Sequence, residues 1–188
     1  EAMKNGAFAY ILKPIDEVEL SETVREAVAK VEKNTFHENL ENALPLLRQH
    51  FLTDLLQNGT VIKQTFEEKC EFFGYDLYSD GYCVAYLIVH QVLSPGSDLL
   101  HLAGRVFDGV PNLKALPVSF GKGDAAVLIS FAGDSAAAYD AVKAACRELV
   151  SAGRDAFVMT VGISSVTEDV EQISRLYLSG VVNKLLNL

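Results

Sequence analysis

The stretch 113–131 constrains the fold of this chain most, because two apolar segments flank one glycine-rich turn in it. The segments read LKALPVSF and AAVLISF, and the turn between them reads GKGD. Gly121 and Gly123 can adopt the positive φ values of tight turns without steric cost, and Asp124 tolerates the same region. The pattern therefore predicts a two-stranded antiparallel hairpin at the centre of the main domain.

Two further strands and three helices are expected around this hairpin. Residues 82–89 (YCVAYLIV) and 157–164 (FVMTVGIS) are apolar at nearly every position, as strands covered by helices are. Helical periodicity predicts helices that begin near Ser97 or Asp98 and at Ser135, and a final helix over 169–186. The order is strand, helix, strand, strand, helix, strand, helix. We therefore expect an α/β (α+β) fold whose sheet contains antiparallel strands and is flanked by helices.

The segment before this domain is predicted to be helical. Helices are expected over 17–31, over 45–57 and over 61–73. The second is predicted to begin at Pro45, because proline is tolerated in the first helical turn but not in a helix interior. Apolar residues that step by four, three, four and four positions form a stripe of coiled-coil spacing: Leu40, Leu44, Leu47, Phe51 and Leu55. Such a stripe is either the seam of a homodimer or the packing face of a helix on its own domain.

Residues 1–33 carry a second pattern. An Asn5-Gly6 helix stop precedes an apolar strand over 8–12, the pair Lys13-Pro14 and an amphipathic helix. This succession resembles the end of a two-component receiver domain. The resemblance implies that Lys13 reaches an aspartyl phosphate on a neighbouring strand and that Pro14, commonly cis in receivers, directs it there. The phospho-accepting aspartate would lie before residue 1, so we expect no phosphorylation of this chain by that mechanism.

The predicted hairpin turn carries a further resemblance. The order of elements matches nucleotide-cyclase palm domains, and the turn Lys122-Gly123-Asp124-Ala125 resembles a degenerate GGDEF motif. Cyclases of this family need acidic side chains that hold two divalent cations. Lys122 stands where the family has its first glycine, and Ala125 stands where it has its second acidic residue. The resemblance therefore implies a palm-like domain whose turn has lost a metal ligand.

The first predicted strand also departs from the cyclase pattern. The family places a metal-binding aspartate at the end of this strand, whereas this chain has Val89, His90 and Gln91 there. With two ligands missing, we expect no cyclase activity, no bound metal pair and no cofactor. The alternative left open is a palm-like domain that binds a nucleotide or metabolite without catalysis.

The string Val161-Gly162-Ile163-Ser164, followed by a helix with a central tyrosine, completes the resemblance. It is similar to the degenerate GGDEF-like domain between the receiver and the AraC-type helix-turn-helix of one class of bacterial response regulators. The implied domains are a receiver remnant (1–33), a helical linker (34–76) and the GGDEF-like domain (77–188). The implied function is phosphorelay signal transduction and transcription regulation, as a homodimer. A sensor histidine kinase and DNA would engage parts of the full-length regulator that are missing here.

Composition limits the partners and the compartment. The formal net charge is −9 and the pI about 4.9, so the chain as a whole repels a phosphate backbone and is not expected to read DNA itself. No apolar run approaches the ~18 residues of a membrane helix, so we expect a cytoplasmic protein. Cys70, Cys83 and Cys146 show no CxxC spacing and are expected to be buried free thiols. The four histidines are scattered and predict no metal site.

Overall fold

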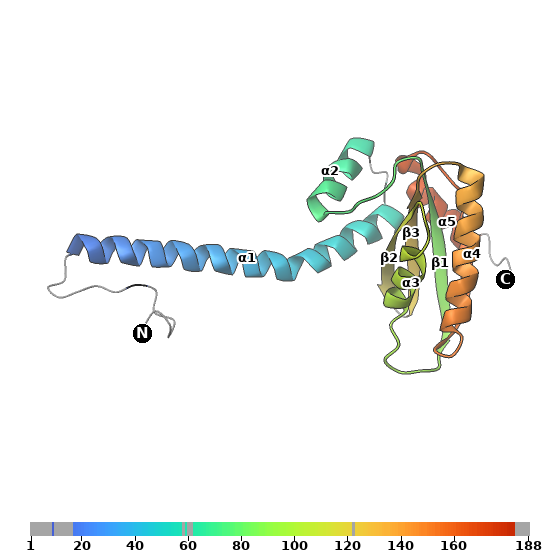
Figure 1. The fold of residues 1–188 in the computed structure, drawn as a ribbon, viewed down its shortest axis with the longest axis horizontal. Helices are drawn as coiled ribbons and strands as arrows, with labels where there is room; N and C mark the ends of the chain where they lie inside the picture. The colour runs from blue at the N-terminus through green and yellow to red at the C-terminus, as the bar shows by residue number, and fades with distance from the viewer. Residues whose placement is uncertain (1–8, 10–16, 58, 60–61, 122, 183–188) are drawn as a thin grey trace. The chain divides into compact units, whose positions relative to one another are not determined.

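The computed structural model describes residues 9, 17–57, 59, 62–121 and 123–182. The chain divides into two compact units, Glu1–Leu47 and Arg48–Leu188. Figure 1 shows its elements, which are in order α1 (Glu17–Gln57), α2 (Lys63–Phe73), β1 (Gly81–Val92), α3 (Leu99–Asp108), β2 (Leu113–Gly121), β3 (Asp124–Phe131), α4 (Ser135–Gly153), β4 (Phe157–Ile163), the 3-10 turn η2 (Val170–Gln172) and α5 (Ile173–Val182). The expected mixture of helices and strands is confirmed, and so is the predicted order from β1 onward.

The four strands form one antiparallel sheet in the order β2-β3-β1-β4. β2 and β3 form the predicted hairpin, and Gly121 and Gly123 adopt positive φ values of 77° and 91° as the turn chemistry requires. β1 and β2 are joined through α3, and β3 lies between them. This connectivity is the split β-α-β arrangement with two crossover helices.

Helices α3 and α4 cover one face of the sheet with a continuous apolar core. Each helix begins at an aspartate whose side chain accepts a backbone N–H: Asp98 from His101 at 3.0 Å, and Asp134 from Ala137 at 2.9 Å. Their apolar stripes meet alternate residues of the strands, because side chains along a strand point to opposite faces. The fully buried members of this core include Cys83, Leu87, Ala103, Val127, Ile129, Phe131, Val142, Cys146 and Leu149.

The end of α1 together with α2 and α5 supplies the buried apolar residues of the other face. The ring of Phe66 in α2 meets Tyr82 of β1 edge to face at 5.9 Å, and Tyr177 of α5 lies 4.6 Å from Tyr86 of β1. The buried residues that α1 contributes are Phe51, Leu52, Leu55 and Leu56. Both faces of β1 are therefore buried from residue 81 to residue 87, which explains why this part of its sequence is apolar without alternation.

Two predicted helix starts are wrong. Pro45 lies inside α1, which runs from Glu17 to Gln57 without a break, so no separate helix begins there. A proline removes one backbone hydrogen bond and crowds the preceding turn, and here the burial of the helix's last turns outweighs that local cost. The final helix begins later than expected, because Asp169 first caps the 3-10 turn η2.

The predicted boundary at 33/34 falls within α1, and the predicted strand over 8–12 lies outside the described residues. Among the helices that the structure describes, none combines the length and the apolar character that crossing a membrane requires.

Candidate functional site

The hairpin turn and the end of β1 lie side by side. A Cβ atom built on Gly123 would lie 3.6 Å from the Cβ atom of Val89. The register agrees with this, because Leu87 of β1 pairs with Ala125 of β3 and the turn follows immediately. The structure therefore brings together the two segments whose departures from the cyclase pattern were recognised in the sequence. Lys122 of the same turn lies outside the described residues.

The side chains at this junction offer one carboxylate. Asp124 is half-buried at the start of β3, whereas Ala125 is buried and has no polar atom in its side chain. His90 is exposed and its Nε2 lies 2.8 Å from Oγ1 of Thr160 on β4, and Gln91 is also exposed. Within the described ranges, no three His, Cys, Asp or Glu side chains gather in a way that could hold a metal ion.

A cavity of about 320 Å³ opens next to the turn. The loop before α3 and the hairpin line it with Gly96, Ser97, Asp98, Ser119, Gly123 and Asp124. Oδ1 of Asp98 caps α3, and Asp124 is the second acidic group of the lining. None of the described lining residues is basic, and two of them, Asp98 and Asp124, are acidic.

The end of α1 contacts the hairpin behind the turn. The Gln49 side-chain amide donates a hydrogen bond to the backbone carbonyl of Ser119, near the end of β2. Gln57, two turns later on the same helix, donates through Nε2 to the hydroxyl of Tyr177 in α5 at 3.3 Å. The ring of Phe120 lies 5.1 Å from that of Tyr177. One helix end therefore holds both the hairpin and α5.

These glutamine contacts were not predicted from the sequence. Gln49 and Gln57 lie eight positions apart and share a helix face, but polar residues on a helix ordinarily indicate a solvated surface. Phe120, the aromatic residue near the end of β2, was the sequence signal that could have indicated packing at this place. Tyr86 on β1 lies next to this aromatic ring. Its pKa is raised mainly by burial, then by the hydrogen bond with Tyr177, and less by the charge of Asp124.

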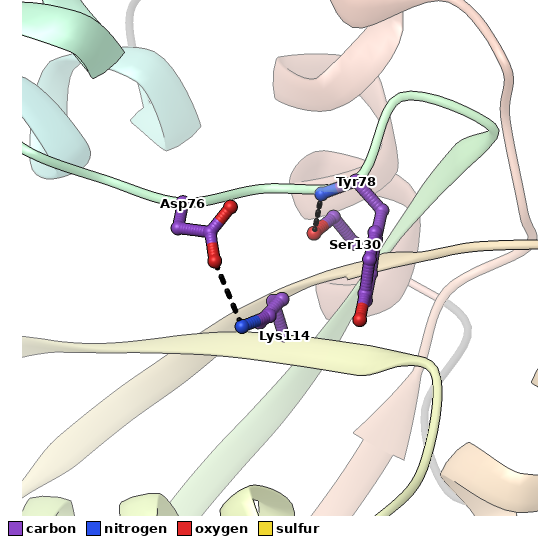
Figure 2. Close-up of polar contacts among 4 residues, drawn as sticks. All are labelled: Asp76, Tyr78, Lys114 and Ser130. Atoms are coloured by element: carbon purple, nitrogen blue, oxygen red, sulfur yellow. Dashed lines mark hydrogen bonds and ion pairs between the residues drawn. The ribbon is translucent and has the colours of Figure 1, made fainter.

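The connection between α2 and β1 is fixed to the sheet by polar contacts (Figure 2). The ammonium group of Lys114 on β2 lies 2.9 Å from a carboxylate oxygen of Asp76, and the backbone N–H of Tyr78 donates to Oγ of Ser130 on β3 at 3.0 Å. The hydrogen bond to Asp76 is the main cause that raises the pKa of Lys114. Asp80 accepts a further bond from the backbone N–H of Gly133 at 2.8 Å. Residues 74–80 are thus tied to both strands of the hairpin.

The predicted seam residues differ in how far their side chains are exposed. Leu44 is half-buried and Leu47 is 46% exposed, whereas Phe51 and Leu55 are 5% and 1% exposed within the second unit. Phe51 stacks on the ring of Phe73 at 5.5 Å, which shows what covers it. The part of the stripe at Phe51 and Leu55 is therefore a packing face on its own domain and is not available to a second helix. The side chain of Leu40 lies outside the described set, as do Lys13 and Pro14.

No protein-family model, no curated protein and no solved structure matches the chain.

Proposed function

We propose that this chain is a non-catalytic signalling module of a two-component response regulator. It connects a receiver to a DNA-binding domain through the helix α1 and a degenerate GGDEF-like palm domain, as part of a cytoplasmic homodimer. The observation that carries this proposal is the continuity of α1, which reaches from Glu17 to Gln57 and ends in the core of the second unit. A helix that the two units share is a physical route by which a displacement can pass from one to the other.

The topology of the sheet supports the palm-like part of the proposal. The order β2-β3-β1-β4 with helices after β1 and β3 is what the resemblance requires, and the turn at Gly123 lies beside Val89 at the end of β1. In an active cyclase both segments would contribute carboxylates to the metal site. Here Val89 and Ala125 contribute none, which favours a regulatory role over catalysis.

The contacts of the helix end suggest how a signal would pass. Phe51 and Leu55 are buried, so α1 cannot turn or slide at this end without moving what it packs against. Its polar contacts lead to the backbone of Ser119 and to the hydroxyl of Tyr177. A change in α1 would therefore shift the hairpin and α5 together.

The helical phase of α1 tests this proposal directly. Inserting five residues between Ala43 and Leu44 of the full-length regulator rotates the two helix ends by about 140°, whereas inserting seven rotates them by only about 20°. We expect the five-residue insertion to abolish phosphorylation-dependent transcription and the seven-residue insertion to retain most of it. Equal activity of the two variants would show that α1 does not act as a rigid connection.

An activity assay tests the non-catalytic part. With GTP and Mg²⁺ or Mn²⁺, we expect no cyclic dinucleotide from the chain. Formation of that product would refute the proposal, because it would require a metal site that Val89 and Ala125 cannot supply.

The cavity beside Asp124 favours one alternative, a ligand-sensing domain without catalysis. Its volume of about 320 Å³ accommodates a small metabolite, and its described lining is acidic and neutral. Calorimetry with GTP, cyclic dinucleotides and small organic cations would test this alternative. A cation that binds the native chain and loses affinity in the Asp124→Asn variant would support it, whereas the absence of heat with every compound would favour the relay alone.

A further inference from the structure

A mostly apolar cavity of about 380 Å³ lies between the start of α4 and the segment that follows β4. Ala136 and Tyr139 of α4 line one side of it, and Ser165 and Val166 line the other. The helix begins with one serine and three alanines, and these small residues leave open space beside the ring of Tyr139. Open apolar surface of this kind can accept a side chain of a partner.

A second cavity, of about 450 Å³, adjoins the first, because Ser135 and Val166 line both. Its lining also includes Glu168 and Asp169, and none of the described lining residues of either cavity is basic. We refer to the two cavities together as the α4 groove. This groove is apolar at the Tyr139 end and acidic at the other end.

The two carboxylates of the α4 groove differ in what they bind. Oδ1 of Asp169 accepts the backbone N–H of Glu171 at 2.9 Å, and its Oδ2 accepts Nε2 of Gln172 at 3.2 Å. The carboxylate of Glu168 is exposed and pairs with no residue in the described part of the chain. Glu168 therefore has the acceptor capacity that a cation from outside would use.

Backbone hydrogen bonds hold the wall opposite α4 in place. The N–H of Tyr82 donates to the carbonyl of Thr167 at 2.7 Å, and the N–H of Thr167 donates to the carbonyl of Tyr82 at 2.9 Å. Oγ of the buried Ser164 accepts the N–H of Val84 at 2.9 Å. A groove whose walls are fixed before binding costs a partner little ordering of the protein.

We propose that the α4 groove binds a short basic segment of another protein. An apolar side chain of that segment lies against Tyr139 and Val166, and a lysine or arginine lies beside Glu168. Charge selects this partner, because a cation gains a charge-assisted hydrogen bond at Glu168, whereas an acidic segment is repelled. The net charge of −9 extends the same preference to the approach of the partner.

Other occupants suit the α4 groove less well. A second copy of this chain also carries a net charge of −9, which opposes its approach to Glu168 and Asp169. A small molecule would be enclosed poorly, since both cavities are wide open to solvent and ligand sites cover most of their ligand. An extended segment can contact both cavities at once. This inference does not rest on the signalling role proposed above.

Titration with short peptides tests the proposal. The probe is a terminally blocked hexapeptide of alternating lysine and leucine, and its two controls carry glutamate in place of lysine or serine in place of leucine. We expect the probe to shift the amide resonances of Tyr139, Val166 and Glu168 and to bind at least ~10-fold more tightly than either control. The two controls test the acidic and the apolar part of the groove separately.

Two lysine substitutions distinguish the α4 groove from attraction by overall charge. Glu168→Lys should weaken binding of the probe at least ~10-fold. Glu148→Lys makes the same change in net charge at an exposed position of α4 outside the groove, and it should weaken binding less than ~2-fold. The amide spectrum of each variant shows whether it is folded.

Four results would overturn the proposal. The first is no binding of the probe at millimolar concentration. The second is an equal loss of affinity in the two variants, which would mean attraction by overall charge alone. The third is a set of shifts confined to another surface. The fourth is a shift of the groove amides with protein concentration in the absence of peptide, which would assign the groove to a second copy of this chain.

Discussion

Burial determines the chemistry of the three cysteines. The structure confirms that Cys70, Cys83 and Cys146 are buried free thiols. Burial raises the pKa of Cys83 and Cys146 to about 12 and that of Cys70 to about 11, because a thiolate loses its hydration inside the protein. We expect none of them to react with a disulfide reagent at pH 8 in the native chain, and all of them to react in denaturant. A thiol that titrates rapidly in the native chain would contradict this burial.

The same shifts predict how stability depends on pH. The thiol of Cys83 titrates near 9.0 in the unfolded chain and near 12 in the folded chain, so between these values the unfolded chain releases a proton that the folded chain keeps. Its contribution is complete below pH 9 and is lost as the pH rises, by about 1 kcal/mol at pH 10. Urea unfolding at pH 8 and pH 10 should show this loss, and a Cys83→Ala variant should lose less over the same interval.

Ser130 is a buried polar residue with a defined structural task (Figure 2). Its Oγ accepts the backbone N–H of Tyr78 at 3.0 Å, and the Ser130→Ala substitution leaves that donor without this acceptor. We expect a loss of about 1–3 kcal/mol in the free energy of unfolding. Ser97→Ala at an exposed position is the matched control and should change it by less than about 0.5 kcal/mol. Similar effects of the two substitutions would mean that the contact with Tyr78 contributes little.

At the scale of the element, α1 has one leucine that is buried and another that is exposed, so the same substitution can be compared at both. Leu55 is 1% exposed in the core of the second unit, whereas Leu46, nine positions earlier, is 74% exposed. Leu55→Ala should cost about 2–5 kcal/mol of unfolding free energy, and Leu46→Ala should cost almost nothing. Equal costs in denaturant unfolding would show that the end of α1 does not pack on the sheet.

Leu47 tests whether the exposed part of the leucine stripe is a dimer seam. It is 46% exposed, so Leu47→Glu should leave the folded domain intact. If the stripe is not the seam, this substitution leaves the association state unchanged in sedimentation. A monomeric but folded Leu47→Glu variant would instead place the interface on α1, at the remaining part of the leucine stripe.

For the whole molecule, charge predicts which partner the chain avoids. A net charge of −9 opposes the approach of a phosphate backbone, and the counterion release that drives non-specific binding needs many basic contacts. We expect no binding of duplex DNA in fluorescence anisotropy at moderate salt. Binding that weakens steeply as salt is added would reveal a basic surface that the overall charge conceals.

Much of the fold follows from local patterns. The hairpin needed only two glycines between two apolar segments. Asp98, which caps α3, was one of two caps predicted from the sequence, and Asp134, which caps α4, lies one residue before the predicted start of that helix. The contact of Val89 with Gly123 joins residues far apart in the chain, so only the structure shows it. The proposed switch residues Lys13 and Pro14, and Lys122 in the turn, remain predictions from the sequence.

By itself the sequence determined the order of elements, the hairpin, the buried thiols and the lack of a carboxylate at Ala125, because each depends on neighbouring residues or on residue identity. The course of α1 through Pro45 and the surroundings of Phe51 and Leu55 were decided by the tertiary structure. A stripe of apolar residues has the same spacing whether it meets a second copy or its own sheet. Only the burial of a side chain against particular neighbours, as of Phe51 against Phe73, distinguishes the two.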